Sequence, residues 1–423
     1  MGMTMAEKIL ASHSERDKVN TGEYVTAKID HVCMYDTVLD IPRSMEEAGI
    51  PGGLERVWDK ERVTLLIDHY APAMDKNVKM AARHVQIREL AKKLDLPNFF
   101  DVKGGICHQL MIEKGFALPG ALTAVTDSHS TIYGGIGCGG TGVGGAEMAW
   151  ILQFGEMWFR VPESIRLEVT GELGKFVMAK DIFLYISGKY GTDMAQYKSM
   201  EWYGPTIDAM SLDGRLCIAT QSVELGAKFS LFPPDKKTLD FVEKRAVREF
   251  TPVYSDADAV YEQTIKLDVG DLSPLVAEPH GMEVVNPAAH YVDVKINQAN
   301  IGGCTNGRIE DIAVAAELFK GKKVHRDVRC ILGAASWDVY KEAIRAGYIE
   351  TLIDAGVIVC HPHCGPCTGV MGVLAAGETA ITATSRNFKV RMGSPEANIY
   401  LSSPATVAAS AITGRITDPR EVQ

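Results

Sequence analysis

The sequence lacks any long apolar run. No stretch of the 423 residues approaches the roughly 18 apolar residues that a membrane-spanning helix requires. The first ten residues, MGMTMAEKIL, contain neither a long apolar core nor a cleavage-like site, so we expect no secretory signal. Residue 6 is Ala6, where N-myristoylation would require Ser or Thr. We therefore expect no membrane partner.

An excess of positive charge is also missing. The net charge is −10 at pH 7, and the pI is about 5.6. An acidic surface disfavours nucleic acids and anionic membranes as partners. A few local arginines can still bind a small anion, so an anionic substrate is compatible with this composition.

The cysteines do not form a disulfide framework. There are nine of them, an odd number, at irregular spacing. Free thiols and thiolate-bound metals suit a reducing compartment, so we expect a cytoplasmic protein.

Apolar patterning predicts an α/β fold with largely parallel sheets. The length predicts two to four domains at about 150 residues each. Expected helices cover residues 1–20, 78–95, 146–158, 179–190, 309–320 and 335–347, and expected strands cover 24–34, 62–67, 121–127, 164–171, 325–332 and 356–361. Because strands alternate with helices, we expect three α/β domains, at 1–162, 163–285 and 286–423. The Pro- and Ala-rich stretch 271–289 resembles a linker.

Three cysteines follow expected strand ends. Cys364 and Cys367, in CGPC, come after the apolar stretch 356–361, and Cys304 lies in the turn IGGCTNGRIED. Three thiolates would leave one iron of a [4Fe–4S] cube without a protein ligand. An open coordination position is what a catalytic metal site needs.

Other readings of these cysteines stay open. CGPC is also the motif of thiol–disulfide exchange, although here His363 precedes it where such enzymes usually carry Trp. A zinc site could add Cys360, His361 or His363 to the pair. Alternatively, Cys304 is simply buried and the CxxC pair is accidental.

The glycine-rich stretch 128–145 is expected to be a loop. Gly137 to Gly142 formally match the dinucleotide pattern G-x-G-x-x-G, but in so glycine-dense a run the match is weak. A loop whose backbone closely approaches a cluster or a carboxylate, and then starts a helix, is the better interpretation.

Candidate acid–base groups and anion-binding groups lie beside expected loops. His69, His108 and His129 are the candidate imidazoles, and Asp68 and Asp127 are the carboxylates near them in sequence. Carboxylate–histidine pairing raises the imidazole pKa and fixes its tautomer, which suits proton transfer. Two arginines at the ends of the SRNFKVR segment could bind a small diacid through bidentate bonds; these are Arg386 and Arg391.

Together these residues resemble the aconitase superfamily, and within it the large subunits of 3-isopropylmalate dehydratase and archaeal-type homoaconitase. The resemblance spans nearly the whole chain and is carried by GICHQLMIEKGFALPGALTAVTDSHSTIYGGIGCGGTGVGGAEMA, WFRVPESIRLEVTGEL, SLDGR, IGGCTNGRIEDI, CGPCTG and SRNFKVRMG. It implies a three-domain α/β fold around a [4Fe–4S] cluster. It further implies a hydro-lyase acting on a small hydroxy di- or tricarboxylic acid, of the 3-isopropylmalate, homocitrate or dimethylmalate type.

The resemblance also implies roles for individual residues. The cluster ligands would be Cys304, Cys364 and Cys367. The acid–base pairs would be His69 with Asp68, His108 with Asp127, and His129 with Glu224, and the substrate-binding residues would be Ser128, Arg386 and Arg391. The family's swivelling domain, with its serine base, has no counterpart here, so the resemblance implies a separate small subunit that supplies this serine.

Several side chains depart from the family pattern around the cluster. Tyr35, Thr220 and Ser385 stand where the family has amides. Neighbouring hydrogen bonds tune a cluster's potential and its chemistry, so one hypothesis is an atypical member with a different substrate or a modified cluster. Ordinary sequence drift is the alternative. A sensor, carrier or sulfur-handling iron–sulfur protein is the alternative function.

Overall fold

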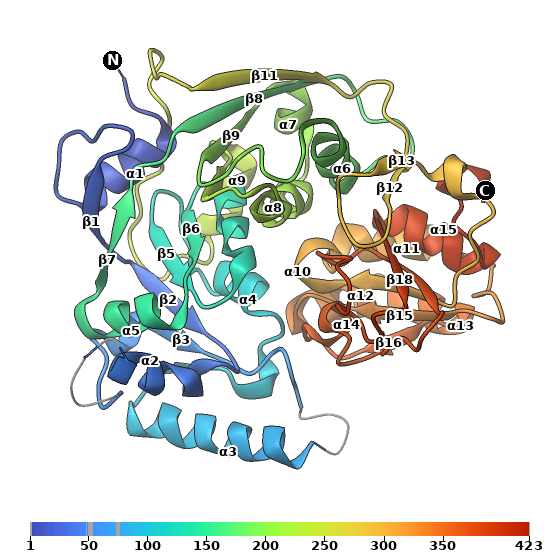
Figure 1. The fold of residues 1–423 in the computed structure, drawn as a ribbon, viewed down its shortest axis with the longest axis horizontal. Helices are drawn as coiled ribbons and strands as arrows, with labels where there is room; N and C mark the ends of the chain where they lie inside the picture. Colours follow the sequence, from blue (N-terminus) through green and yellow to red (C-terminus); the bar gives the residue numbers. More distant parts are fainter. Residues whose placement is uncertain (1, 48, 50–53, 73–76, 423) are drawn as a thin grey trace. The chain divides into compact units, whose positions relative to one another are not determined.

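The computed structural model describes residues 2–47, 49, 54–72 and 77–422. The chain forms two compact units, each assembled from three segments (Figure 1). Unit 1 contains residues 1–169, 195–208 and 222–267, and unit 2 contains residues 170–194, 209–221 and 268–423. Among the described helices, none is both long and apolar enough to cross a membrane.

A parallel five-stranded sheet forms the centre of unit 1. Its strand order is β4-β3-β2-β5-β6, and each neighbouring pair is parallel. The strands are β2 (His31–Met34), β3 (Val63–Leu65), β4 (Asn98–Phe99), β5 (Leu122–Val125) and β6 (Gly139–Gly142). The helices of this region are α1 (Met5–His13), α2 (Ile41–Glu47), α3 (Val78–Lys93), α4 (Cys107–Glu113) and α5 (Gly145–Phe154). The strands β2, β3 and β5 are buried along their whole length, as expected of parallel strands covered on both faces.

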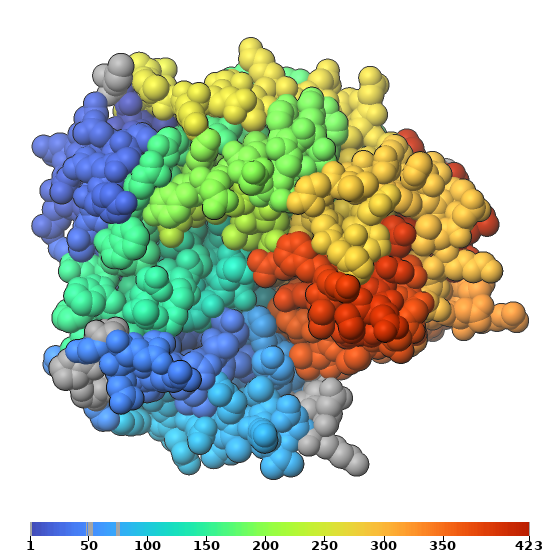
Figure 2. All heavy atoms as spheres, in the orientation of Figure 1, coloured from blue at the N-terminus to red at the C-terminus, as the bar shows by residue number. Residues whose placement is uncertain are grey.

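Two smaller sheets complete unit 1. A four-stranded sheet has the order β10-β9-β8-β11, with β8 (Ser164–Thr170), β9 (Ser199–Tyr203), β10 (Phe229–Leu231) and β11 (Gln263–Asp268). Its helices are α7 (Pro205–Ala209) and α9 (Lys236–Glu243). The N-terminal β1 (Tyr24–Lys28) pairs antiparallel with β7 (Glu156–Arg160). The blue and green segments that meet on the surface in Figure 2 follow from this pairing of distant parts of the sequence.

Unit 2 is built on a seven-stranded sheet. Its order is β13-β12-β18-β17-β14-β15-β16, parallel from β18 to β16 and antiparallel at β12 and β13. The strands are β12 (Leu275–Ala277), β13 (Val285–Pro287), β14 (Gln298–Gly302), β15 (Arg329–Gly333), β16 (Ile358–Cys360), β17 (Thr379–Thr382) and β18 (Asn398–Ser402). The helices are α6 (Ala179–Tyr190), α8 (Leu212–Gln221), α10 (Gly303–Asn306), α11 (Ile309–Phe319), α12 (Trp337–Arg345), α13 (Tyr348–Ala355), α14 (Gly365–Thr368) and α15 (Pro404–Thr413).

The α/β class and the parallel sheets are confirmed, but several element boundaries were wrong. The first helix ends at His13 rather than residue 20, and Glu15 just beyond it has a φ of 56°. Helix α5 ends at Phe154 because Gly155 adopts a left-handed conformation with a φ of 75°, a common way for helices to stop. Residues 156–158, expected to be helical, therefore belong to strand β7.

The stretches expected to be a loop and a linker are ordered. Residues 128–145 contain a 3₁₀ helix, η4 (Ser128–Ile136), and strand β6. The glycines there allow close backbone packing, since a Cβ at Gly134 would lie 1.7 Å from the carbonyl oxygen of Ser230. Residues 271–289 contain β12 and β13.

Two further sequence expectations concern strand burial and domain division. Strand β16, expected to be buried, is an edge strand with Ile358 51% exposed. The three-domain division stays a prediction. Residues 163–285 contribute to both compact units.

Candidate active site

The acid–base candidates gather within unit 1 at the carboxyl ends of its parallel strands. Asp68 and His69 follow β3, and Asp127 follows β5. His108 lies in α4 and His129 in η4, while Glu224 lies in the short 3₁₀ helix η5 (Ser222–Leu225). In open parallel sheets the loops at these strand ends are where ligands usually bind.

Asp127 is the centre of this group. Its Oδ1 lies 2.7 Å from His108 Nε2 and accepts a hydrogen bond of 2.9 Å from the backbone N–H of His129. Its Oδ2 lies 3.3 Å from His69 Nε2. The other two carboxylates each serve one imidazole: Asp68 Oδ1 lies 2.6 Å from His69 Nδ1, and Glu224 Oε1 lies 2.9 Å from His129 Nε2. Three imidazoles and three carboxylates thus form one connected network.

The network keeps opposite charges on its members. Burial alone would lower the pKa of His69, but the carboxylates of Asp68 and Asp127 outweigh it and raise this pKa well above its usual value. Burial would raise the pKa of Asp127, but His108, His129 and His69 hold it well below its usual value. At neutral pH the site therefore contains a protonated imidazole beside an ionised carboxylate.

Asp36 fixes the backbone beneath the His69–Asp68 pair, and sequence reasoning missed it. Its Oδ2 accepts hydrogen bonds from the backbone N–H groups of Asp68 (3.1 Å) and His69 (2.8 Å). Its Oδ1 lies 3.3 Å from Nε2 of His84, a buried residue of α3. The backbone amides that Asp36 binds lie more than thirty positions away in the sequence. The only sequence signal for a role of Asp36 is therefore its position directly after Tyr35.

Tyr35 covers one face of His69. The two rings stack with centroids 4.2 Å apart and planes inclined by 26°. Burial raises the pKa of the Tyr35 hydroxyl, so this group stays protonated. The residue expected near the cluster thus contacts the acid–base network directly.

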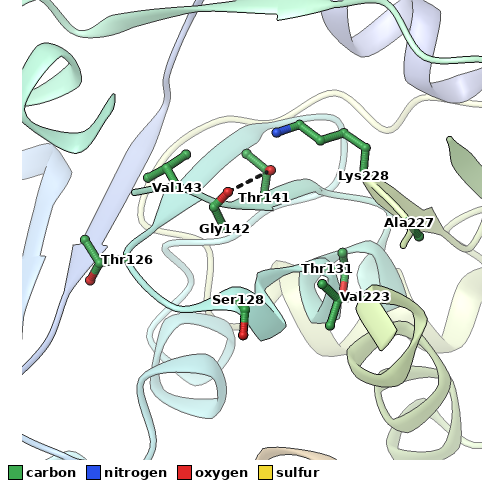
Figure 3. Close-up of a pocket in the computed structure, with 9 residues that line it drawn as sticks. All are labelled: Thr126, Ser128, Thr131, Thr141, Gly142, Val143, Val223, Ala227 and Lys228. Carbon is green, nitrogen blue, oxygen red and sulfur yellow. Dashed lines mark hydrogen bonds between the residues drawn. The ribbon is translucent and has the colours of Figure 1, made fainter. Parts of the chain in front are cut away.

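Ser128 lines a cavity of about 300 Å³ within unit 1 (Figure 3). Threonine hydroxyls and one lysine share the lining, which comprises Thr126, Ser128, Thr131, Thr141, Gly142, Val143, Val223, Ala227 and Lys228. Burial lowers the pKa of Lys228 to about 8. A cavity of this composition suits a small polar or anionic group.

The three candidate ligand cysteines lie together in unit 2, all buried. Cys304 is in α10, at the end of β14, and Cys364 and Cys367 lie at the start of α14 and within it. Gly303 lies beside Cys367, since a Cβ at Gly303 would be 3.9 Å from the Cβ of Cys367, an ordinary van der Waals contact. Its φ of 82° is one that glycine adopts without strain.

Hydrogen-bond donors surround Cys367. A hydrogen bond from Cys364, the charge of Arg391 and the Ser385 hydroxyl outweigh burial and hold the pKa of Cys367 well below its usual value. Arg391 Nη2 lies 3.2 Å from Cys367 Sγ, and its Nε donates to the Cys367 carbonyl at 2.9 Å. The Ser385 hydroxyl lies 3.2 Å from the same sulfur. These contacts favour the thiolate form of Cys367, which is the form that binds metals.

Two other predicted residues lie elsewhere in unit 2. Thr220, in α8, is fully buried, and its hydroxyl donates to the carbonyl of Leu216. Arg386 is half-buried beside Ser385, in the segment between β17 and β18.

Comparisons with known proteins identify the family of this chain. The model of the aconitase family (aconitate hydratase) matches residues 4–288 and 281–414. The chain belongs to the aconitase family. It is 46% identical over its full length to the whole 3-isopropylmalate dehydratase large subunit of Halothermothrix orenii. It is 43% identical to a probable methanogen homoaconitase large subunit of Methanothermobacter thermautotrophicus, covering 99% of this chain and 98% of that one.

The fold comparison points the same way. The crystal structure of Thermococcus kodakaraensis aconitase X superposes with a TM-score of 0.51 at 13% identity, covering 86% of this chain and 84% of that one. This likeness concerns the fold alone. As a member of the aconitase family with these relatives, the chain is an enzyme of the hydro-lyase class.

In the described part of the chain, one trio of His, Cys, Asp or Glu side chains has its ligand atoms within 4.8 Å of one another, and that trio is Asp36, Asp68 and His69. The three candidate ligand cysteines are not part of this group. Cys360, which the zinc reading would add, contacts Met371, and burial raises the Cys360 pKa to about 11.

Proposed function

We propose that this chain is the large subunit of a dehydratase or isomerase for a small hydroxy di- or tricarboxylic acid, of the 3-isopropylmalate, homocitrate or dimethylmalate type. The observation that carries the proposal is the network of three imidazoles joined through Asp127. A sensor or carrier protein needs no such proton-transfer network, and the hydro-lyase class of the family supports the enzyme over that alternative.

His69 is the proposed proton donor. Its imidazole is held in the protonated form by Asp68 and Asp127, and protonation lets a substrate hydroxyl leave as water rather than as hydroxide. Asp127 and Asp68 then hold the His69 ring in its orientation and favour its reprotonation after the proton has been donated. Asp36 supports this pair by binding the two backbone amides beneath it.

Cys304, Cys364 and Cys367 are the proposed ligands of a [4Fe–4S] cluster. When bound, such a cluster supplies a Lewis acid through its iron that has no protein ligand. Arg386 and Arg391 would bind substrate carboxylates, and Ser128 a further polar group of the substrate. All nine cysteines lie in the described residues and none forms a disulfide, which suits a reducing cytoplasm, the compartment we propose.

A small subunit is the proposed partner. It would supply the serine base that removes the proton from the substrate carbon, and it would complete the substrate pocket. The large chain alone is then expected to bind the cluster without turning over substrate.

The test begins with protein purified without oxygen. Iron, zinc and acid-labile sulfide are measured, and EPR spectra are recorded for oxidised and reduced samples. About four irons and four sulfides per chain, or a three-iron signal in air that disappears when iron is added, would support the site. A screen of hydroxy diacids with and without a small subunit would then identify the substrate. Zinc alone, or no metal, would overturn the cluster, and turnover without the small subunit would overturn the proposed partnership.

A further inference from the structure

Lys180 is buried beside the cysteine site without a carboxylate partner. It lies in α6, its residue is fully buried, and its Nζ donates to the carbonyl oxygens of Ala383 (2.7 Å) and Thr384. Within the part of the chain that the structure describes, no carboxylate lies within ion-pair distance of it. The adjacent Asp181 instead accepts hydrogen bonds from the backbone N–H groups of Met178 and Leu275. A buried ammonium without an ion-pair partner is costly, so a bound negative charge nearby would stabilise it.

The two carbonyls that Lys180 binds connect it to the cysteine loops. The carbonyl of Ala383 also accepts a hydrogen bond of 3.1 Å from the hydroxyl of Thr305, the neighbour of Cys304. Thr384 precedes Ser385, whose hydroxyl lies 3.2 Å from the Cys367 sulfur. Lys180 therefore joins the loop of Cys304 to the segment that contacts Cys367.

Other cations surround the same cysteines. Arg308 donates to the carbonyls of Cys304 and Thr305, and Arg391 donates to the carbonyl and sulfur of Cys367. Asp311 is a buried carboxylate that acts electrostatically on both Lys180 and Arg308, and burial raises its pKa to about 7. The surroundings of the three thiols thus carry an excess of positive charge.

We propose that Lys180 is the fixed counter-charge of the cluster held by Cys304, Cys364 and Cys367, and that it also positions their loops. A cluster bound by three thiolates is anionic, and reduction adds one more negative charge. A nearby buried cation therefore favours the reduced form and raises the reduction potential. The two hydrogen bonds to the segment 383–384 limit movement of the cysteine loops and slow the loss of iron. This inference rests on the cluster proposed above.

Three substitutions separate the charge from the hydrogen bonds. Lys180→Arg keeps the charge and the donors, Lys180→Gln keeps a donor without the charge, and Lys180→Met removes both. Lys228→Met is the matched control, since Lys228 is also a lysine whose pKa burial lowers to about 8, but it lies in unit 1. The measurements are the reduction midpoint from an EPR-monitored titration, and the rate of iron release in air, on the anaerobically purified holoprotein.

The reduction midpoint should depend on the charge of residue 180, and the rate of iron release should depend on its hydrogen-bond donors. In Lys180→Gln and Lys180→Met we expect the reduction equilibrium to fall about tenfold, which is ~59 mV for one electron. Lys180→Arg and Lys228→Met should keep the wild-type midpoint. Iron release should be fastest in Lys180→Met and intermediate in Lys180→Gln.

The possible failures are distinguishable. Wild-type protein without iron and sulfide would overturn the proposed cluster itself. Loaded wild-type protein with an unchanged midpoint in Lys180→Gln would overturn the counter-charge role alone, and iron release at the wild-type rate in the same variant would overturn the positioning role. If Lys180→Met does not fold, the glutamine variant still tests the charge.

Discussion

The acid–base network of unit 1 and the cysteine site of unit 2 balance their charges in opposite ways. In unit 1 each imidazole lies beside a carboxylate, and Asp127 alone contacts three of them. In unit 2 the cations Lys180, Arg308 and Arg391 bind mainly backbone carbonyls. The first site pairs each imidazole with a carboxylate, whereas the cations of the second site bind carbonyl oxygens and, for Arg391, the sulfur of Cys367.

This difference shows which site depends on a bound group. Proton transfer uses side chains that the chain itself supplies, so the network of unit 1 can be complete in the protein alone. The cysteine site gathers thiols and cations, and the anionic cluster that we propose for it would balance their charge. Substitutions in the two units should therefore separate chemistry from cofactor retention.

The largest effect is expected from removing a cluster ligand. The variant Cys367→Ala lacks one of the three thiolates proposed to bind the cluster. We therefore expect it to lose nearly all iron and sulfide, and its activity with them. The readouts are iron and sulfide content, with circular dichroism to follow the fold. Cys330→Ala is the matched control, because Cys330 is a buried cysteine within strand β15 of the same sheet. Full iron content in Cys367→Ala would contradict the assignment.

Removing the central carboxylate should stop the chemistry and leave the cluster in place. In Asp127→Asn the three imidazoles lose their shared anion, and we expect kcat to fall about 10³-fold, within the usual range for acid–base groups. Steady-state kinetics with the small subunit and iron analysis test this together. Loss of iron in this variant would show that the two sites are not separable in the way described.

The orientation of the His69–Asp68 pair should depend on Asp36. In Asp36→Ala two backbone amides lose their acceptor, and we expect kcat to fall about 10- to 100-fold with a smaller change in KM, because a small displacement of a reacting group is costly. Asp36→Asn retains one acceptor oxygen and should recover part of the loss. Equal losses in both variants would indicate that the charge of Asp36, rather than its hydrogen bonds, matters.

A smaller effect is expected from Tyr35→Asn. Loss of the ring stacked on His69 should change kcat/KM about 2- to 10-fold, on the order of the 0.5–1.5 kcal/mol of an aromatic contact. A change in the preferred diacid or in the EPR spectrum would support an atypical member of the family. An unchanged preference and spectrum would favour ordinary drift.

The smallest expected effect is on how the free energy of unfolding depends on pH. The folded pKa of His69 is raised, so its stabilising contribution is fully present below the unfolded pKa of about 6.5 and is lost as the pH rises through the folded pKa. The unfolding free energy of the wild type relative to His69→Gln should therefore shrink as the pH rises from about 6.5 into the alkaline range. Urea unfolding across this range measures it, and a difference that grows with pH would have the wrong sign.

Local patterns in the sequence predicted much of the fold. The expected helices at 78–95, 179–190 and 309–320 correspond to α3, α6 and α11, because apolar spacing survives in a single sequence. The end of α5 and the strand within the glycine-rich stretch were missed, because they depend on a left-handed Gly155 and on a backbone approach between Gly134 and Ser230.

Only those residues of the candidate site that belong to recognisable sequence motifs could be predicted. The histidines, carboxylates and cysteines could be named from their spacing and from the family resemblance. Asp36 and Lys180 could not, since their partners are backbone groups rather than characteristic side chains. The acceptors of Lys180 lie 203 and 204 positions further along the chain.

That long separation has a consequence for biosynthesis. The ribosome completes α6 about two hundred residues before it reaches Ala383 and Thr384, whose carbonyls accept the hydrogen bonds of Lys180. The last proposed cysteine ligand, Cys367, is synthesised only shortly before these two residues. The cluster proposed for this site could therefore be bound only after translation is nearly finished. A chain truncated before Ala383 would lack both carbonyl acceptors of the Lys180 ammonium.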